Sequence, residues 1–190
     1  SLTSMDDTTT VGSVMSGGTD SKRGKHVPAD AREGCLLFIR ALCEIAGKKA
    51  EPYVVGAFLA AALDECASSS GAIREAAQDT AAAIVNVANP WSFSKVLCPL
   101  LLHALITNQW RVKANALECL KQCTVTAPAQ VQKLIPTLVP ALSSQVWDTK
   151  AQVSKGARLT LLAICDTNLN PDTKKAIPSV VNAICKPSDT

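Results

Sequence analysis

Residues 145–165 read QVWDTKAQVSKGARLTLLAIC, and their apolar side chains recur at the period of an α-helix. The apolar stripe consists of Val153, Ala157, Leu161 and Ile164. These residues stand at i, i+4, i+8 and i+11, so they share one helix face. Asp148 and Thr149 precede the stripe, where a side-chain oxygen can cap the first turn of a helix. The stretch therefore predicts an amphipathic helix that buries one face.

The same helix occurs twice earlier in the chain. Its counterpart residues are Val112, Ala116 and Leu120 in one copy and Ile73, Ala77 and Ala81 in the other. The copies are offset by 39 and 41 residues. A period near 40 residues in a helical pattern is typical of a solenoid of helical repeats. The sequence thus predicts an all-α, right-handed α-solenoid of about four repeats over residues 29–190.

A second series of helices is expected to alternate with the first. Its expected members are residues 51–67, 91–106, 129–142 and 172–185. Pro99, Pro136 and Pro178 occupy one equivalent position in three of them, with Ala57 in the remaining copy. A proline inside a helix removes a backbone donor and kinks the helix. A kinked first helix followed by a straight, basic second helix is similar to the HEAT type of repeat.

The two ends of the chain depart from this pattern. Residues 1–28 are rich in Ser, Thr, Gly and Asp, so we expect a disordered tail and a domain boundary near residue 29. The first helix is expected to run from a capping Asp30 to Ala46, with Gly47 ending it. The last expected helix has no partner helix after it. This predicts a fragment of a longer solenoid, with weak self-association through the uncapped end.

Residues suited to chemistry are few. The eight cysteines fall in or at the ends of helical patterns, and the first thirty residues hold no apolar segment of a signal peptide. We therefore interpret the cysteines as reduced core residues of a cytoplasmic protein. No phosphate-binding loop, metal-ligand set or nucleophile motif meets its required spacing, and no apolar run is long enough to span a membrane. We expect no catalysis, no metal or other cofactor, and no small-molecule substrate.

Charge is distributed unevenly along the chain. The net charge is +3 overall, but residues 29–89 carry five basic and eight acidic side chains, whereas residues 90–190 carry eleven and five. The second half is thus favoured to meet an anionic partner. The candidate contact residues on the second helices of the repeats are Arg111, Lys113, Lys121, Lys150, Lys155 and Arg158. They can bind phosphate or an acidic protein surface, or simply keep the surface soluble, and the sequence leaves these alternatives open.

The three tryptophans do not share an equivalent repeat position. Trp91 and Trp147 adjoin turns, so we expect them to pack against the starts of helices. Packing is favoured over stacking on nucleic-acid bases.

Four short segments stand in an order that is found in a known family. They are EPYVV at 51–55, IVNVANP at 84–90, WDTKAQV at 147–153 and IPSVV at 177–181. In this order they resemble the amino-terminal HEAT domain of translation elongation factor 3, although the Ser/Gly-rich tail departs from that family's helical beginning. A similar segment occurs in the large translational activator of the eIF2-alpha kinase.

The resemblance implies a ribosome-binding arm that touches ribosomal RNA and ribosomal proteins. The parent protein would be a cytosolic ATPase that promotes release of tRNA from the exit site, with its ATP-binding cassettes outside this chain. The relative that activates a kinase implies the alternative, a scaffold for protein–protein interaction.

Overall fold

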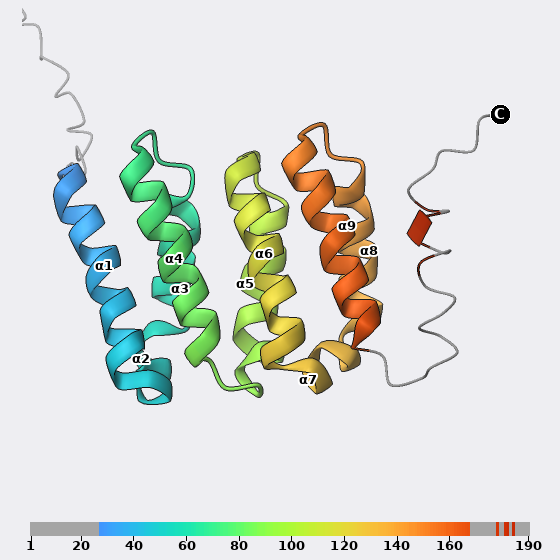
Figure 1. Cartoon of the computed structure of the whole chain (residues 1–190), viewed down its shortest axis with the longest axis horizontal. Coiled ribbons are helices and arrows are strands. Elements are labelled where there is room, and N and C mark those ends of the chain that lie inside the picture. Colours follow the sequence, from blue (N-terminus) through green and yellow to red (C-terminus); the bar gives the residue numbers. More distant parts are fainter. Residues whose placement is uncertain (1–26, 168–177, 179–180, 183, 185–190) are drawn as a thin grey trace, which may run out of the picture.

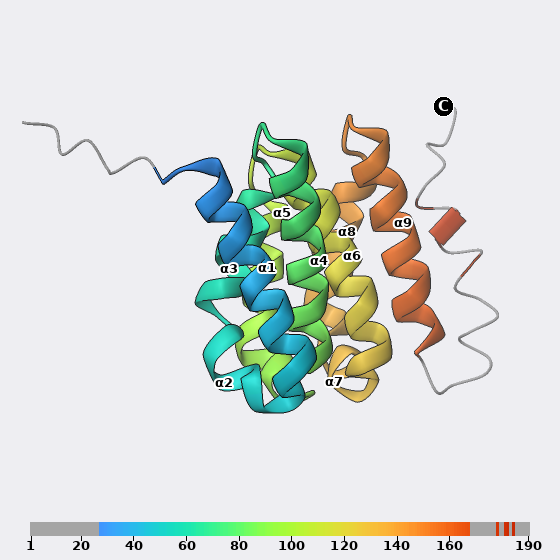
Figure 2. The same cartoon turned by 60° about the vertical axis from the view of Figure 1, so that its left-hand side comes forward.

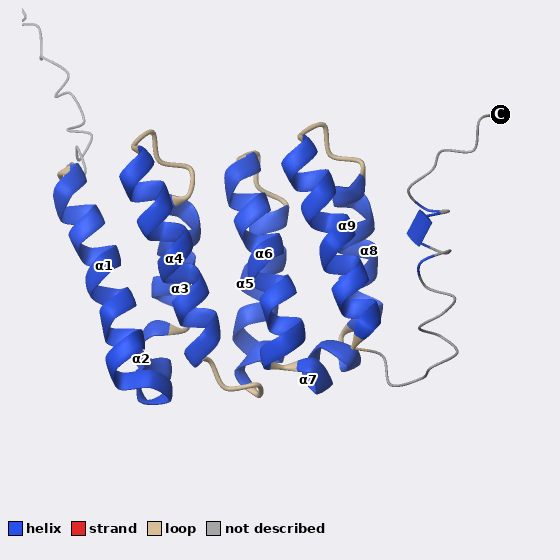
Figure 3. Ribbon diagram, viewed as in Figure 1, coloured by secondary structure: helices blue, strands red, loops and turns tan. Residues whose placement is uncertain are grey.

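The computed structural model describes residues 27–167, together with residues 178, 181, 182 and 184, and in this part of the chain every regular element is a helix (Figure 3). One layer contains the helices α1 (Ala29–Ala46), α4 (Gly71–Val87), α6 (Trp110–Thr126) and α9 (Ala151–Asp166). The other layer contains α3 (Ala57–Glu65), α5 (Cys98–Leu105) and α8 (Ile135–Val146). The helices of each layer lie side by side (Figures 1 and 2), which confirms the predicted all-α solenoid.

Helix α1 is the first helix of the described part, and three helical pairs follow it there: α3 with α4, α5 with α6, and α8 with α9. This is the predicted arrangement of repeats. Residues 1–26 of the expected tail and most of the expected helix 172–185 lie outside the described residues. The expected uncapped end and its self-association therefore stay predictions.

The second helix of each pair buries the face that its sequence predicts. In α9 the buried side chains include Val153, Ala157, Leu161 and Ile164. The equivalent residues of α4 and α6 are buried as well. Neighbouring helices of this layer pack directly on one another, α1 on α4, α4 on α6 and α6 on α9. The 3.6-residue periodicity therefore identified the core-facing side of these helices correctly.

Two of the predicted helix caps are wrong. Helix α9 begins at Ala151 with Lys150 at the capping position and no capping side chain. Asp148 instead accepts a hydrogen bond from the Lys150 backbone N–H at 2.9 Å, which closes the turn before the helix. Asp30 lies inside the first turn of α1, which begins after Pro28. Gly47 ends α1 as predicted, with φ at 54°, a conformation that glycine adopts without a steric penalty.

Two of the first helices of the pairs are broken, and the one over 91–106 changes from a π-helix to an α-helix, whereas the sequence predicted continuous helices. Residues 51–67 form α2 (Glu51–Val54) and α3; residues 91–106 form the π-helix η2 (Phe93–Leu97) and α5; residues 129–142 fall in α7 (Pro128–Lys133) and α8. Pro136 stands second in α8, after Leu134 has left the helical conformation, so it marks the restart of a helix rather than a kink. Pro99 also stands second in its α-helix, but α5 follows η2 without a gap, so the helix runs on through a π-helical turn at the proline, as predicted for a proline inside a helix. In the first pair Gly56, with φ at 115°, makes the break without a proline.

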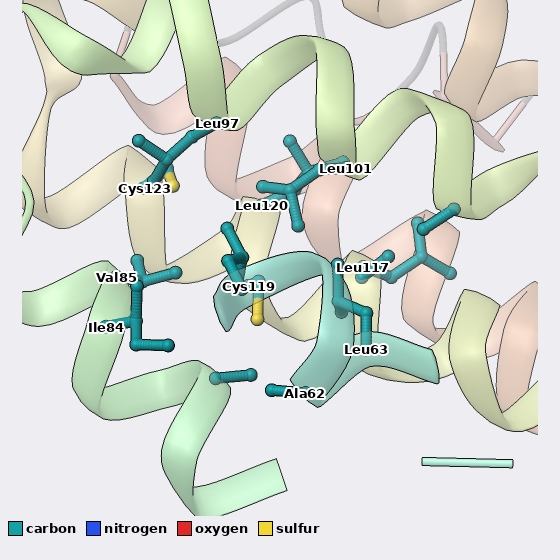
Figure 4. Packing of buried hydrophobic residues seen from close by; sticks show 14 of the residues in the cluster. Ala62, Leu63, Ile84, Val85, Leu97, Leu101, Leu117, Cys119, Leu120 and Cys123 are labelled. Carbon is teal, nitrogen blue, oxygen red and sulfur yellow. The ribbon is translucent and has the colours of Figure 1, made fainter. Parts of the chain in front are cut away.

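Between the layers lies one continuous apolar core. Figure 4 shows Cys119 and Leu120 of α6 among side chains from α3, α4 and α5. Five of the described cysteines are buried in this core as free thiols, namely Cys43, Cys66, Cys98, Cys119 and Cys123. Cys35 is exposed, so not every cysteine is a core residue. The buried thiols fill space as small apolar groups do.

Buried threonines connect helices of successive repeats. The hydroxyl oxygen of Thr160 lies 3.0 Å from the Leu117 carbonyl oxygen on α6 and 2.9 Å from that of Gly156 in its own helix. Thr80, at the equivalent position of α4, lies 3.0 Å from the Leu36 carbonyl oxygen on α1. Each hydroxyl therefore finds a carbonyl acceptor inside the core, and it joins two helices of one layer.

We expect Thr160→Val to lower the free energy of unfolding by about 1 kcal/mol, because valine keeps the shape but cannot donate to the Leu117 carbonyl. Urea denaturation measures the change. Thr149→Val is the matched control, since Thr149 is exposed in the turn before α9 and should change stability by less than about 0.5 kcal/mol. Equal losses in the two variants would contradict the structural role of Thr160.

Candidate functional site

The structure places the six candidate cations on two neighbouring helices. Arg111, Lys113 and Lys121 lie on α6, whereas Lys155 and Arg158 lie on α9 and Lys150 immediately precedes it. Because α6 and α9 pack against each other, the two groups occupy adjacent parts of one layer. The repeat pattern had predicted this juxtaposition.

The three cations on α6 already have intramolecular partners. Lys113 Nζ lies 2.8 Å from Asp148 Oδ2, with only 18% and 14% of the two side chains exposed. Lys121 Nζ lies 2.7 Å from Glu118 Oε1. The Arg111 guanidinium stacks over the ring of Trp110 at 4.7 Å from its centroid. Three of the six predicted contact residues are therefore already in contact with other side chains of the same chain.

Asp148 links the turn before α9 to α6. Hydrogen bonding by the Lys113 side chain, and then by the Lys150 backbone N–H, lowers the pKa of the Asp148 carboxyl. The carboxylate is therefore charged at neutral pH and uses its two oxygens for two different segments. The conspicuous WDTK sequence thus has a structural role, in which its aspartate fixes the α8–α9 turn.

The cations of the α9 group face solvent. Lys150, Lys155 and Arg158 are exposed, and none of them forms an ion pair with another described residue. We refer to these three residues as the α9 cations. They are the part of the predicted set that the structure leaves most accessible to an anionic partner.

Sequence reasoning passed over another set of exposed cations at one end of the helices. Its members are Lys48, Lys49, Lys95 and Lys133. Each of them lies where the chain passes from the second helix of one repeat toward the first helix of the next. Their shared place in the connections between repeats could have identified these lysines from the sequence. It was missed because the connections differ in length, so the lysines do not align from repeat to repeat.

The two tryptophans beside turns do not pack as expected. Trp91 is 70% exposed and Trp147 is 54% exposed. Lys133 Nζ approaches the Trp91 ring to 5.7 Å from its centroid. Most of the surface of each residue is therefore exposed, and the prediction that these rings pack against the starts of helices is wrong.

A polar groove lies on the surface where α1 and α4 meet. It encloses about 350 Å³, and its lining includes Arg40, Glu44, Asp79 and Asn86. The Arg40 guanidinium lies 2.8 Å from a Glu44 oxygen and 2.6 Å from an Asp79 oxygen, so it bridges the two carboxylates. Both hydrogen bonding and the nearby negative charges raise the pKa of Arg40. The charges of this groove therefore largely compensate one another.

The described residues contain no cluster of three or more side chains able to hold a metal ion. Burial raises the pKa of the Cys66 thiol to about 11 and that of Cys123 to about 12, and it also raises the pKa of Cys119. These thiols stay protonated near neutral pH, which disfavours a role as nucleophiles. None of the described helices combines the length and the apolar character needed to cross a bilayer.

Comparison with known proteins identifies relatives that act in translation. The model of the family described as EF3 N-terminal HEAT repeat matches residues 4–161, so the match begins within the segment expected to be a disordered tail. Elongation factor 3 of Mycosarcoma maydis is 29% identical over 165 residues, which cover 86% of this chain and 16% of that protein. Elongation factor 3 of Gonapodya prolifera is 34% identical over 159 residues, covering 83% and 14%.

A relative of another kind matches the same part of the chain. The human stalled ribosome sensor GCN1 is 34% identical over 157 residues, which cover 83% of this chain and 6% of that protein. The chain therefore spans less than a fifth of the length of each of these three relatives.

We expect alkylation of the native protein to label the exposed Cys35 well before the buried Cys66, Cys119 and Cys123. Thiolate is the reactive form, and burial both suppresses it and blocks the reagent. Mass spectrometry after a short treatment with iodoacetamide, with and without urea, locates the modified residues. Labelling of native Cys119 as fast as Cys35 would contradict the packing between the layers.

We expect Lys113→Met to lower the free energy of unfolding at neutral pH by about 1–2 kcal/mol, because it removes the charged donor to Asp148. The folded state lowers the pKa of Asp148 below its ordinary 3.8, so this contribution is present above about pH 4 and disappears as the pH falls through the lowered pKa.

Urea denaturation at neutral and acid pH measures this effect. Lys121→Met is the matched control, since it removes a more exposed ion pair that should contribute less than about 1 kcal/mol. A difference between wild type and Lys113→Met that persists unchanged in acid would exclude the ion pair as its cause.

Proposed function

The chain belongs to the family of the EF3 N-terminal HEAT repeat, and from this premise we propose that it is a ribosome-binding module of a translation elongation factor. Its relatives already make it a translation-related HEAT-repeat module. We assign no catalysis to the chain itself. Release of tRNA from the exit site, driven by ATP, belongs to the proposed activity of a longer cytoplasmic protein, since the chain spans only 16% of the elongation factor from Mycosarcoma maydis.

The observation that carries this proposal is the set of exposed α9 cations on a member of this family. Lys150, Lys155 and Arg158 are exposed on α9 or immediately before it and have no ion-pair partner among the described residues. Exposed cations of this kind can bind RNA phosphates, releasing counterions as they do so. The planar guanidinium of Arg158 can also make bidentate hydrogen bonds to a phosphate. On this view ribosomal RNA is the main contact, and ribosomal proteins border it.

Within the original candidate set the α9 cations would bind most strongly. Arg111 and Lys121 lie beside them on α6 and can contribute after rearranging their present contacts. Lys113 is mostly buried against Asp148, so its contribution is to stability. The six residues are equivalent by sequence position, but they differ in exposure and in their intramolecular contacts.

A scaffold for protein–protein interaction is the second candidate. The observation in its favour is that the human stalled ribosome sensor GCN1 is 34% identical to the chain. Elongation factor 3 of Gonapodya prolifera is also 34% identical, so sequence identity does not separate the two candidates. A scaffold of this kind would hold a protein partner whose binding survives digestion of RNA. Binding to intact ribosomes that is lost after RNase treatment would favour the elongation-factor module instead.

We expect the full chain to sediment with ribosomes at about 50 mM salt and much less at about 200 mM salt, because phosphate contacts weaken as salt rises. Replacing the α9 cations by glutamine (Lys150→Gln, Lys155→Gln and Arg158→Gln) should weaken binding at low salt by about ten-fold or more. Co-sedimentation of purified ribosomes with wild type and variant gives both comparisons.

The matched control carries Ala61→Glu, Ala72→Glu and Gln78→Glu, three exposed positions on α3 and α4. It changes the net charge by the same amount as the glutamine variant and should retain most of the binding. Equal losses in the two variants would show that only net charge matters. A folded wild type that stays in the supernatant at low salt would refute the proposed function.

A further inference from the structure

A separate basic surface lies at the end of the helices where successive repeats are joined. The 3-10 turn η1 (Gly47–Ala50), the connection 88–92 and helix α7 all lie at this end, at the bottom of Figure 1 and again in Figure 2. The connections within each helical pair lie at the opposite end. Lys48, Lys49, Lys95 and Lys133, with Trp91, form what we call the basic edge. All four lysines are exposed, and none has an ion-pair partner among the described residues.

Specific contacts join these segments into one surface. The Glu51 carboxylate, directly after η1, accepts a hydrogen bond at 2.9 Å from the Asn89 backbone N–H and another from the Ser92 hydroxyl. Helix α7 packs against η2, and its Lys133 reaches the Trp91 ring. Three connections that are distant in sequence are thereby held side by side.

The charge of the basic edge is poorly compensated. Among residues 47–54, 88–97 and 128–133 the four lysines are accompanied by a single carboxylate, Glu51. The Glu51 carboxylate accepts hydrogen bonds from Asn89 and Ser92, so it joins the segments and pairs with none of the four lysines. These segments therefore carry an excess of about three positive charges, of which Asp166, next to α7 at the end of α9, offsets only one, and this excess attracts a polyanion.

The indole of Trp91 is presented to solvent by a fixed turn. The Asn89 side-chain oxygen accepts a hydrogen bond from the Trp91 backbone N–H at 3.0 Å, while Glu51 holds the Asn89 backbone. Lys133 orients the ring from one side by a cation–π contact. With 70% of its surface exposed, Trp91 contributes little to the core. Tyr53 on α2, 75% exposed, adds a second exposed aromatic ring to these segments.

We propose that the basic edge binds RNA, with its lysines on backbone phosphates and an unpaired base stacked on Trp91. Lysine heads on exposed stems suit phosphates, and an exposed indole beside Lys133 suits a base of any identity. An acidic protein surface would use the lysines but would gain nothing specific from the indole. This inference deepens the proposed ribosome binding and rests on it, and it adds a surface separate from the α9 cations.

The test uses the full chain and a fluorescein-labelled RNA hairpin with an unpaired loop, followed by anisotropy at several salt concentrations. We expect the triple variant Lys48→Gln, Lys95→Gln and Lys133→Gln to bind about ten-fold or more weakly at low salt, and the slope of log affinity against log salt to become shallower by about 2–3. The control with Ala61→Glu, Ala72→Glu and Gln78→Glu should keep the wild-type slope. An unchanged slope in the lysine variant overturns the inference.

Matched tryptophan variants test the stacking. Trp91→Ala should weaken hairpin binding by about five-fold or more, and Trp91→Phe should restore part of it, because phenylalanine still offers a face for a base. Trp147→Ala, which removes another exposed indole beside a turn, should bind as wild type does. Equal losses in Trp91→Ala and Trp147→Ala overturn the stacking, and so does tighter binding to a labelled polyglutamate peptide than to the hairpin.

Ribosome co-sedimentation of the same proteins separates this inference from the proposed function. If wild type sediments with ribosomes while the lysine variant binds the hairpin normally, RNA binding by the basic edge is refuted and the proposed ribosome binding stands. If wild type binds the hairpin but does not sediment with ribosomes, the proposed function fails while RNA binding by the edge stands. Unchanged urea midpoints in all variants confirm that each one is folded, as the exposure of the substituted side chains leads us to expect.

Discussion

Close packing between the second helices of successive repeats is the constraint on which the rest of the structure depends. Ala77, Ala116 and Ala157 are fully buried at these contacts. At Gly156 a side-chain carbon would come within 3.3 Å of the Leu117 side chain, so α9 approaches α6 so closely there that even an alanine would require Leu117 to shift slightly. Small side chains at a period near 40 residues bring each helix against the previous one, and the buried threonines then find carbonyl groups across the contact.

This packing determines where the chain can offer residues to a partner. The second helices bury one face, so their polar side chains emerge on the other face of that layer or at its ends. The first helices change near a common position and leave the short segments α2, η2 and α7 at one end of the solenoid, next to the turn η1. Connecting segments carry accessible side chains on a rigid support, which is a common origin of binding surfaces. Both proposed contact surfaces, the α9 cations and the basic edge, follow from this arrangement.

Much of the fold could be predicted from the residues. The apolar stripe of α9 and its echoes gave the helices, their buried faces and the repeat period. The aligned prolines predicted a kink in the first helices, but they could not show that the helix runs on at Pro99 and begins anew at Pro136. That choice depends on how the preceding segment packs against neighbouring repeats, and the local sequence carries no information on such packing.

The sequence by itself determined a helical repeat, its core-facing residues and an excess of positive charge in the second half of the chain. Only the tertiary structure decided which cations are accessible. The partners Lys113 and Asp148 are separated by 35 residues, and Arg40 and Asp79 by 39. Trp91 and Lys133 likewise meet only because α7 packs beside η2. Hydrophobic periodicity is a local property of one helix, whereas charge pairing and exposure depend on the register between helices, which is set only when the repeats pack together.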